Sequence, residues 1–214
     1  MSKSRKWLLL AATIVALLLV PTVALAADSD LPPGGTFVDD DGIAQEGWIE
    51  AIAAIRLTVG CNPPEGDEYC PEARITRAQM ATMLVRGLGL DSLDEGPFTD
   101  LGDTPHAANI NAIAAAGITR GCNPPANDRF CPERPVSRQE IAAFLVRAFE
   151  IPATESDYFA DDDDSIFESD INALAAAGVT SGCSETSFCG PVKLTRAHMA
   201  VFMGRILGLT PDVP

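Results

Sequence analysis

The sequence is poor in lysine and histidine and carries little positive charge. Its 214 residues include 30 acidic and 15 basic side chains, which gives a formal net charge of −15, and Lys193 is the single lysine after residue 26. Such a chain has no basic stripe of the kind that nucleic acid or an anionic lipid surface requires. We therefore exclude nucleic acid as a partner and polyanion binding through bulk charge as a function.

The two histidines, His106 and His198, occupy unlike places in the chain, and neither lies inside a cysteine loop. The cysteines also lack the two-to-four-residue spacing of structural zinc sites, so zinc is disfavoured. No serine or cysteine recurs together with a partner base, which leaves no catalytic constellation. We expect no metal ligand, no cofactor and no catalytic residue, and the chain is not interpreted as an enzyme.

Residues 1–26 have the three parts of a secretory signal peptide: a basic start, an apolar run and the small residues "ALA" before Ala27. The alternative is an uncleaved membrane anchor, because the apolar run is nearly long enough to span a bilayer. Removal of the three basic residues in this segment takes the formal charge from −15 to −18. We expect a secreted protein of the cell surface, with a linker at residues 27–36.

The rest of the chain repeats itself three times. Three sets of residues recur at intervals of 61: Phe37, Phe98 and Phe159; Ile49, Ile110 and Ile171; Cys61, Cys122 and Cys183. A fixed period of this length is typical of tandem structural units. The sequence therefore predicts three repeats, at residues 37–97, 98–158 and 159–214.

All six cysteines lie in pairs inside these repeats. Paired cysteines in an exported protein are typical of disulfides, and the repetition favours pairing within each unit. The predicted bridges are Cys61 with Cys70, Cys122 with Cys131, and Cys183 with Cys189. Each closes a short loop and is worth about 2–3 kcal/mol by chain-entropy arguments. Units of this size bury little surface, so we expect both a bridge in each unit and contacts between units.

Each unit is predicted to contain two helices with a bridged loop between them. In the second unit, residues 106–118 ("HAANINAIAAAGI") have apolar residues at helical spacing and close on Gly117. The first unit has Arg56 at the corresponding place, which predicts either a strain of about 1 kcal/mol or an altered helix ending. Little or no strand is expected, so the fold class is all-α.

The second helix of each unit has a clear start. Ser137 is the predicted N-cap residue in the second unit, and Glu140 is its capping-box partner. The corresponding starts are Thr76, with Gln79 three residues later, and Thr195. The third unit has a histidine in place of the usual partner and is expected to keep the cap without the reciprocal bond.

An arginine directly follows each of these N-cap residues: Arg77, Arg138 and Arg196. A cation is unfavourable at a helix N-terminus, so an anionic group should offset it. One candidate is a carboxylate of the chain, and aspartates recur at one suitable position: Asp39, Asp100 and Asp161. The other is the acid group of a ligand that meets both the guanidinium and the free helix N–H groups. The residues alone leave both open.

Two acidic runs, at residues 39–41 and 161–164, invite a calcium interpretation. Neither has the alternating ligand spacing and terminal bidentate glutamate of a calcium loop. We therefore favour solvated acidic turns, with weak calcium binding as the alternative.

The phenylalanine-aspartate opening, the "GIT" ending of the first helix, "FCP" and the start of the second helix together resemble S-layer homology repeats. The stretch "GCNPPANDRFCPERPVSRQEIAAFLVRAF" is most similar to the cysteine-containing version found in exported actinobacterial proteins. The resemblance covers residues 37 to about 209. It implies that three helix-loop-helix repeats form one pseudo-threefold, three-pronged body with a shared helical core.

In that family the grooves between prongs hold acidic, often pyruvylated, sugars of a secondary cell wall polymer. The resemblance implies non-covalent attachment to a cell wall polysaccharide, and its signature matches "ITRAQ", "VSRQE" and "LTRAH" here. Arg77, Arg138 and Arg196 are therefore the expected ligand-binding residues. The shortened third cysteine loop and His198 make the third groove the one expected to be altered. The alternative function is a self-assembling surface scaffold without glycan binding; the oligomeric state and a separate cargo protein stay open.

Overall fold

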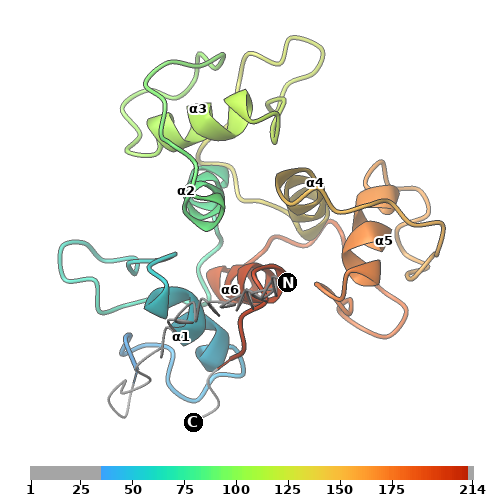
Figure 1. Cartoon of the computed structure of the whole chain (residues 1–214), viewed down its shortest axis with the longest axis horizontal. Helices are drawn as coiled ribbons and strands as arrows, with labels where there is room; N and C mark the ends of the chain where they lie inside the picture. The colour runs from blue at the N-terminus through green and yellow to red at the C-terminus, as the bar shows by residue number, and fades with distance from the viewer. Residues whose placement is uncertain (1–34, 212–214) are drawn as a thin grey trace, which may run out of the picture. The chain divides into compact units, whose positions relative to one another are not determined.

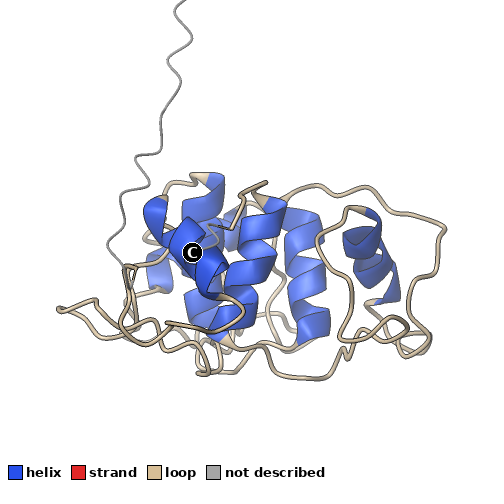
Figure 2. Cartoon of the chain, turned by 90° about the horizontal axis from the view of Figure 1, so that it is seen from below, coloured by secondary structure: helices blue, strands red, loops and turns tan. Residues whose placement is uncertain are grey.

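Residues 35–211 are described by the computed structural model and belong to one compact unit. They contain six helices: α1 Glu46–Ala54, α2 Arg77–Leu88, α3 Ala107–Ala115, α4 Arg138–Ala148, α5 Glu168–Ala176 and α6 Arg196–Ile206. The same residues contain isolated β-bridges but no strand, and Figure 2 shows helices joined by long loops. The prediction of an all-α fold is confirmed. The predicted signal peptide, and the linker up to residue 34, lie outside the described residues.

Helices α2, α4 and α6 begin at the predicted caps. Thr76 and Ser137 each accept a hydrogen bond from the backbone N–H three residues on, and the Gln79 and Glu140 side chains complete both capping boxes. Thr195 accepts in the same way from His198, whose ring Nδ1 lies 2.8 Å from the threonine hydroxyl instead of reaching the cap backbone. The third cap therefore lacks the reciprocal bond, as the sequence predicted.

Helices α1, α3 and α5 end at a residue in the left-handed conformation. Gly117 and Gly178 adopt φ values of 73° and 72° after α3 and α5. Arg56 takes the same place after α1 with φ 58°, although a side chain there is strained. The helix ending is therefore not altered in the first repeat, and Arg56 adopts the left-handed conformation without a glycine.

Helices pair across the boundaries of the predicted repeats. Contacts join α2 to α3, α4 to α5, and α6 back to α1, so each pair takes one helix from each of two neighbouring repeats. Figure 1 shows α2, α4 and α6 grouped together, each with one of the other helices on its outer side. The main helix packing is therefore made between repeats, and the α1 and α6 pair brings the first and last repeats together.

A closed cycle of backbone hydrogen bonds also links the segments that enter α2, α4 and α6. Ile75 donates to the carbonyl of Leu194, Leu194 donates to Val136, and Val136 donates to Ile75, at 2.9–3.1 Å. All three side chains are buried in the core. The starts of the three inner helices are fixed against one another by this cycle.

The loops between helices are held by disulfides and aromatic pairs. The three bridges pair Cys61 with Cys70, Cys122 with Cys131, and Cys183 with Cys189, which confirms the predicted pairing. The residue directly before the second cysteine of each bridge has a buried aromatic ring. This ring packs on the phenylalanine that opens the same repeat, at 5.3–5.6 Å between ring centroids: Tyr69 on Phe37, Phe130 on Phe98 and Phe188 on Phe159. Three disulfides fit an oxidising compartment. None of the helices within residues 35–211 is long and apolar enough to cross a membrane.

The prediction that both acidic runs are solvated turns is wrong for one aspartate in each. Asp40 and Asp162 are 0% and 2% exposed, and neither carboxylate has a hydrogen-bond partner among the described residues. Both occupy the position that Leu101 fills in the second repeat, where an apolar side chain packs against the core. Their burial follows from this position, which faces inward in all three repeats.

Candidate functional site

The three arginines predicted as ligand-binding residues are buried and bonded to backbone carbonyls of another repeat. Arg77, Arg138 and Arg196 are 2%, 9% and 6% exposed. Their Nε–H groups donate to the carbonyl oxygens of Phe130, Phe188 and Tyr69, at 2.7, 2.8 and 2.7 Å. Each arginine therefore joins the start of one inner helix to the disulfide loop of the next repeat in the cycle.

Each guanidinium also lies over the aromatic ring whose carbonyl it binds. Its central carbon is 4.6 Å from the ring centroid of Phe130 for Arg77, 4.8 Å from Phe188 for Arg138, and 4.6 Å from Tyr69 for Arg196. Burial lowers the pKa of all three arginines, and that of Arg77 falls to about 10. Carbonyl dipoles and ring faces stabilise the three guanidinium groups in this buried setting.

Among the described residues, the recurring aspartates form no direct ion pair with the three arginines, but each acts on one of them at longer range: the charges of Asp100, Asp161 and Asp39 oppose the lowering of the pKa of Arg77, Arg138 and Arg196. Asp39, Asp100 and Asp161 each accept two backbone N–H groups of the cysteine loop in their own repeat, at 2.6–2.8 Å. Of the three arginines, only Arg77 forms a described ion pair, with Glu140 at 3.8 Å. The partners predicted from the sequence were a carboxylate of the chain or the acid group of a ligand. Neither prediction included the backbone carbonyl that binds each arginine in the structure.

Arg138 differs from the other two in its terminal nitrogens. Nη2 of Arg77 and of Arg196 donates to the carbonyl of Gly121 and of Gly60, each at 3.4 Å. Within residues 35–211, no hydrogen bond engages Nη1 or Nη2 of Arg138, and this side chain lines a pocket instead. Of the three predicted ligand residues, Arg138 is thus the one with donors directed at an open space.

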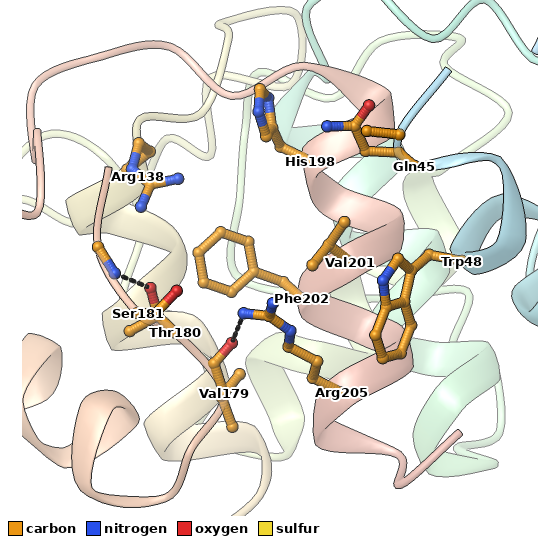
Figure 3. A pocket seen from close by; sticks show the side chains of 12 residues that line it. Gln45, Trp48, Arg138, Val179, Thr180, Ser181, His198, Val201, Phe202 and Arg205 are labelled. Carbon is orange, nitrogen blue, oxygen red and sulfur yellow. Dashed lines mark hydrogen bonds between the residues drawn. The ribbon is translucent and has the colours of Figure 1, made fainter. Parts of the chain in front are cut away.

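The pocket lies between α1, α6 and the segment after α5 (Figure 3). Its volume is about 240 Å³. Arg205 enters it from α6 and donates to the carbonyl of Val179 at 3.3 Å. The indole of Trp48 on α1 lies under this guanidinium, with 5.8 Å between the guanidinium carbon and the ring. Polar groups of Thr180 and Ser181 complete the opposite wall.

Trp48 has room in this wall because residue 204 is a glycine. A Cβ atom at Gly204 would come within 2.4 Å of the indole. The corresponding residues on α2 and α4 are Val85 and Val146. The flat ring and the missing side chain therefore occur together in this pair of helices alone.

The described lining of the pocket contains two arginines, Arg138 and Arg205, in a protein of net negative charge. Neither Asp nor Glu is among its twelve described lining residues, although the chain holds 30 acidic side chains. His198 also lines it, and burial, with Arg138 nearby, lowers the pKa of this imidazole below its ordinary value. At neutral pH the histidine is uncharged, so Arg138 and Arg205 supply the positive charge.

The two corresponding places between the other helix pairs have different chemistry. Between α2 and α3, the Thr82 hydroxyl lies 2.7 Å from His106 Nδ1 and accepts from Asn109 Nδ2 at 2.9 Å. Between α4 and α5, Asp170 replaces Trp48, and burial raises the pKa of its carboxyl against the opposing effect of Arg147. An anionic ligand would thus meet side chains that already hydrogen-bond to one another between α2 and α3, and a carboxylate between α4 and α5.

No protein-family model matches this chain. Over 83 residues, or 38% of its length, it is 39% identical to an endoglucanase of Bacillus sp. (strain KSM-635). The matched part amounts to 8% of that protein, so the chain spans a small fraction of its relative.

Proposed function

We propose that the protein attaches non-covalently to the cell envelope by binding an acidic, pyruvylated polysaccharide in the pocket between α1 and α6. The observation that carries this proposal is the exclusion of every carboxylate from a pocket that holds two arginines, in a chain with a formal charge of −15. Guanidinium groups bind carboxylates in a planar, two-pronged geometry, which suits the acid group of such a sugar.

The rest of the pocket suits a saccharide. An indole face packs against the apolar face of a sugar ring, and the Thr180 and Ser181 hydroxyls can exchange hydrogen bonds with sugar hydroxyls. The net negative charge of the protein would repel an acidic polymer at long range, but physiological salt confines that repulsion to about 8 Å. Local contacts with Arg138 and Arg205 would therefore dominate.

The likeness to a short part of a much longer protein supports a module of this kind, since a segment that recurs inside a larger chain can serve as its attachment unit. The proposal concerns binding alone and assigns no hydrolytic activity to this chain.

Sedimentation with purified cell walls tests the proposal. The protein should co-sediment with walls that carry pyruvyl groups and lose most of this binding after the pyruvyl groups are removed. Trp48→Ala should weaken binding at least tenfold, whereas Asn109→Ala, at the corresponding position of α3, should leave it unchanged. Failure to bind any wall fraction, together with concentration-dependent self-association, would favour the scaffold alternative.

A further inference from the structure

The acidic turn that opens the third repeat contains a carboxylate that the fold leaves unused. Asp161 is fully engaged, because its two oxygens accept the backbone N–H groups of Phe188 and Cys189 at 2.6 and 2.8 Å. Its neighbour Asp162 is 2% exposed, and neither of its oxygens has a hydrogen-bond partner within residues 35–211. A buried carboxylate without a partner is costly and calls for a compensating group.

Two further carboxylates converge on this one. Oxygen atoms of Asp157, Asp162 and Asp163 all lie within 4.8 Å of one another. Two oxygens that bind the same Ca²⁺ at 2.3–2.6 Å can be at most about 5 Å apart, so this spacing fits a shared ion. Asp157 and Asp163 are exposed, which gives an ion a path from solvent and leaves room for water ligands.

The repeats show that this arrangement is not a requirement of the fold. In the second repeat the three positions are Gly96, Leu101 and Gly102, with no acidic group. The first repeat has Asp40 and Asp41 but Gly35 at the position of Asp157. The full set of three carboxylates therefore occurs only in the third repeat.

We propose that Asp157, Asp162 and Asp163 form a binding site for a divalent cation, with Ca²⁺ preferred. The buried carboxylate of Asp162 would bind the ion from the protein side, and the two exposed carboxylates would close over it. Ca²⁺ accepts six to eight oxygen ligands in flexible geometry, and water can supply those that the turn lacks, whereas Mg²⁺ demands a near-ideal octahedron. The site is separate from the pocket between α1 and α6 and does not depend on the proposed function.

The bound ion would join Asp157, two residues before Phe159, to the turn that follows Phe159. Phe159 packs on Phe188, and Asp161 holds the backbone of the same disulfide loop. Binding should therefore stabilise the third repeat against local unfolding, since a ligand that binds only the native state raises its stability.

Calorimetric titration of the purified protein with CaCl2, after treatment with a chelator, tests the site. We expect one Ca²⁺ with a dissociation constant of about 10⁻⁴–10⁻³ M, as in extracellular calcium modules, and binding of Mg²⁺ at least tenfold weaker. The Tm should rise by several degrees in millimolar Ca²⁺ and return when the chelator is added.

Two variants copy residues that the chain itself uses in the second repeat, so both are compatible with the fold. Asp162→Leu and Asp157→Gly should each weaken Ca²⁺ binding at least tenfold and remove the rise in Tm. Asp40→Leu is the control, because Asp40 of the first repeat corresponds to Asp162. It should leave the calcium response intact. Absence of calcium binding by the unaltered protein, an equal response to Mg²⁺, or an unchanged response in Asp162→Leu would each overturn the proposal.

Discussion

The guanidinium of Arg196 donates its Nε–H to the carbonyl oxygen of Tyr69 at 2.7 Å, although 127 residues separate them in the chain. The hydroxyl of Tyr69 returns a hydrogen bond to the carbonyl of Arg196 at 2.8 Å. The same arginine lies over the tyrosine ring, so one pair of residues combines two hydrogen bonds with a cation–π contact. This pair joins the last inner helix to the first cysteine loop and closes the cycle that Arg77 and Arg138 continue.

Arg196→Ala should therefore destabilise the whole fold. The substitution leaves a buried carbonyl without its charged donor and removes the packing on Tyr69, which should lower the free energy of unfolding by about 2–3 kcal/mol. Arg196→Lys should recover little of this, because an ammonium cannot donate in the same plane while it stacks on the ring. Urea denaturation measures both changes. Exposed Arg147→Ala is the control, and an equal loss in it would refute a special role for Arg196.

Arg56→Gly should stabilise the protein by about 1 kcal/mol, because glycine adopts the left-handed conformation of this residue without strain. The reverse change, Gly117→Ala, should cost a similar amount. Nothing lies within 4 Å of a Cβ atom at Gly117, so its effect would report backbone strain alone. Thermal unfolding of both variants checks the pair. Equal and small effects at the two sites would show that neither position is strained.

Asp40 should make the protein less stable as the pH rises from about 4 to about 7. Burial raises the pKa of this carboxyl to about 7, with further contributions from Glu50, Glu46 and Asp39. In the unfolded chain the group titrates near 3.9. The native state therefore binds the proton more tightly, so its stability is greatest below about pH 4, falls through this window, and stays reduced above about pH 7.

Asp40→Leu should remove this effect, since Leu101 occupies the same position in the second repeat. We expect the variant to gain about 1–3 kcal/mol at pH 8, the usual cost of an unsatisfied buried polar group, and to gain less at pH 4. Denaturation of both proteins at the two pH values, in the presence of a chelator, provides the measurement. A gain that is the same at pH 4 and pH 8 would contradict the raised pKa.

The features predicted correctly from the sequence are those that depend on local spacing. A capping box needs residues three positions apart, and each disulfide closes a loop inside one repeat, so both can be read from a short window. The partner of Arg196 could not be predicted in this way. It is a main-chain carbonyl, which every residue carries, and it lies in another repeat. The pairing of α6 with α1 was not predicted for the same reason, because the local sequence of a helix does not identify the helix that packs against it.

Other parts of the site had a signal that comparison between the repeats could have shown. Leu101 aligns with Asp40 and Asp162, and an apolar residue at one of three equivalent positions indicates that the position is buried. Trp48 aligns with Asn109 and Asp170, and Gly204 with two valines. Trp48 and Gly204 thus both differ from the aligned residues of the other repeats, and both lie in the helix pair that forms the pocket.

The central claim is that the pocket binds an acidic glycan through its arginines. Arg205 and Arg86 occupy corresponding positions, and both donate to a backbone carbonyl, that of Val179 at 3.3 Å and that of Leu57 at 3.1 Å. Replacement of either by glutamine removes one cation and a similar structural contact. Only Arg205 lines the pocket between α1 and α6.

Calorimetric titration of the unaltered protein, Arg205→Gln and Arg86→Gln with purified pyruvylated wall polysaccharide is the most direct measurement. Loss of one charge-assisted hydrogen bond costs about 1.5–3 kcal/mol, so Arg205→Gln should bind roughly ten- to a hundredfold more weakly. Arg86→Gln should bind as the unaltered protein does. Equal affinity in all three proteins, or an equal loss in both variants, would contradict the account.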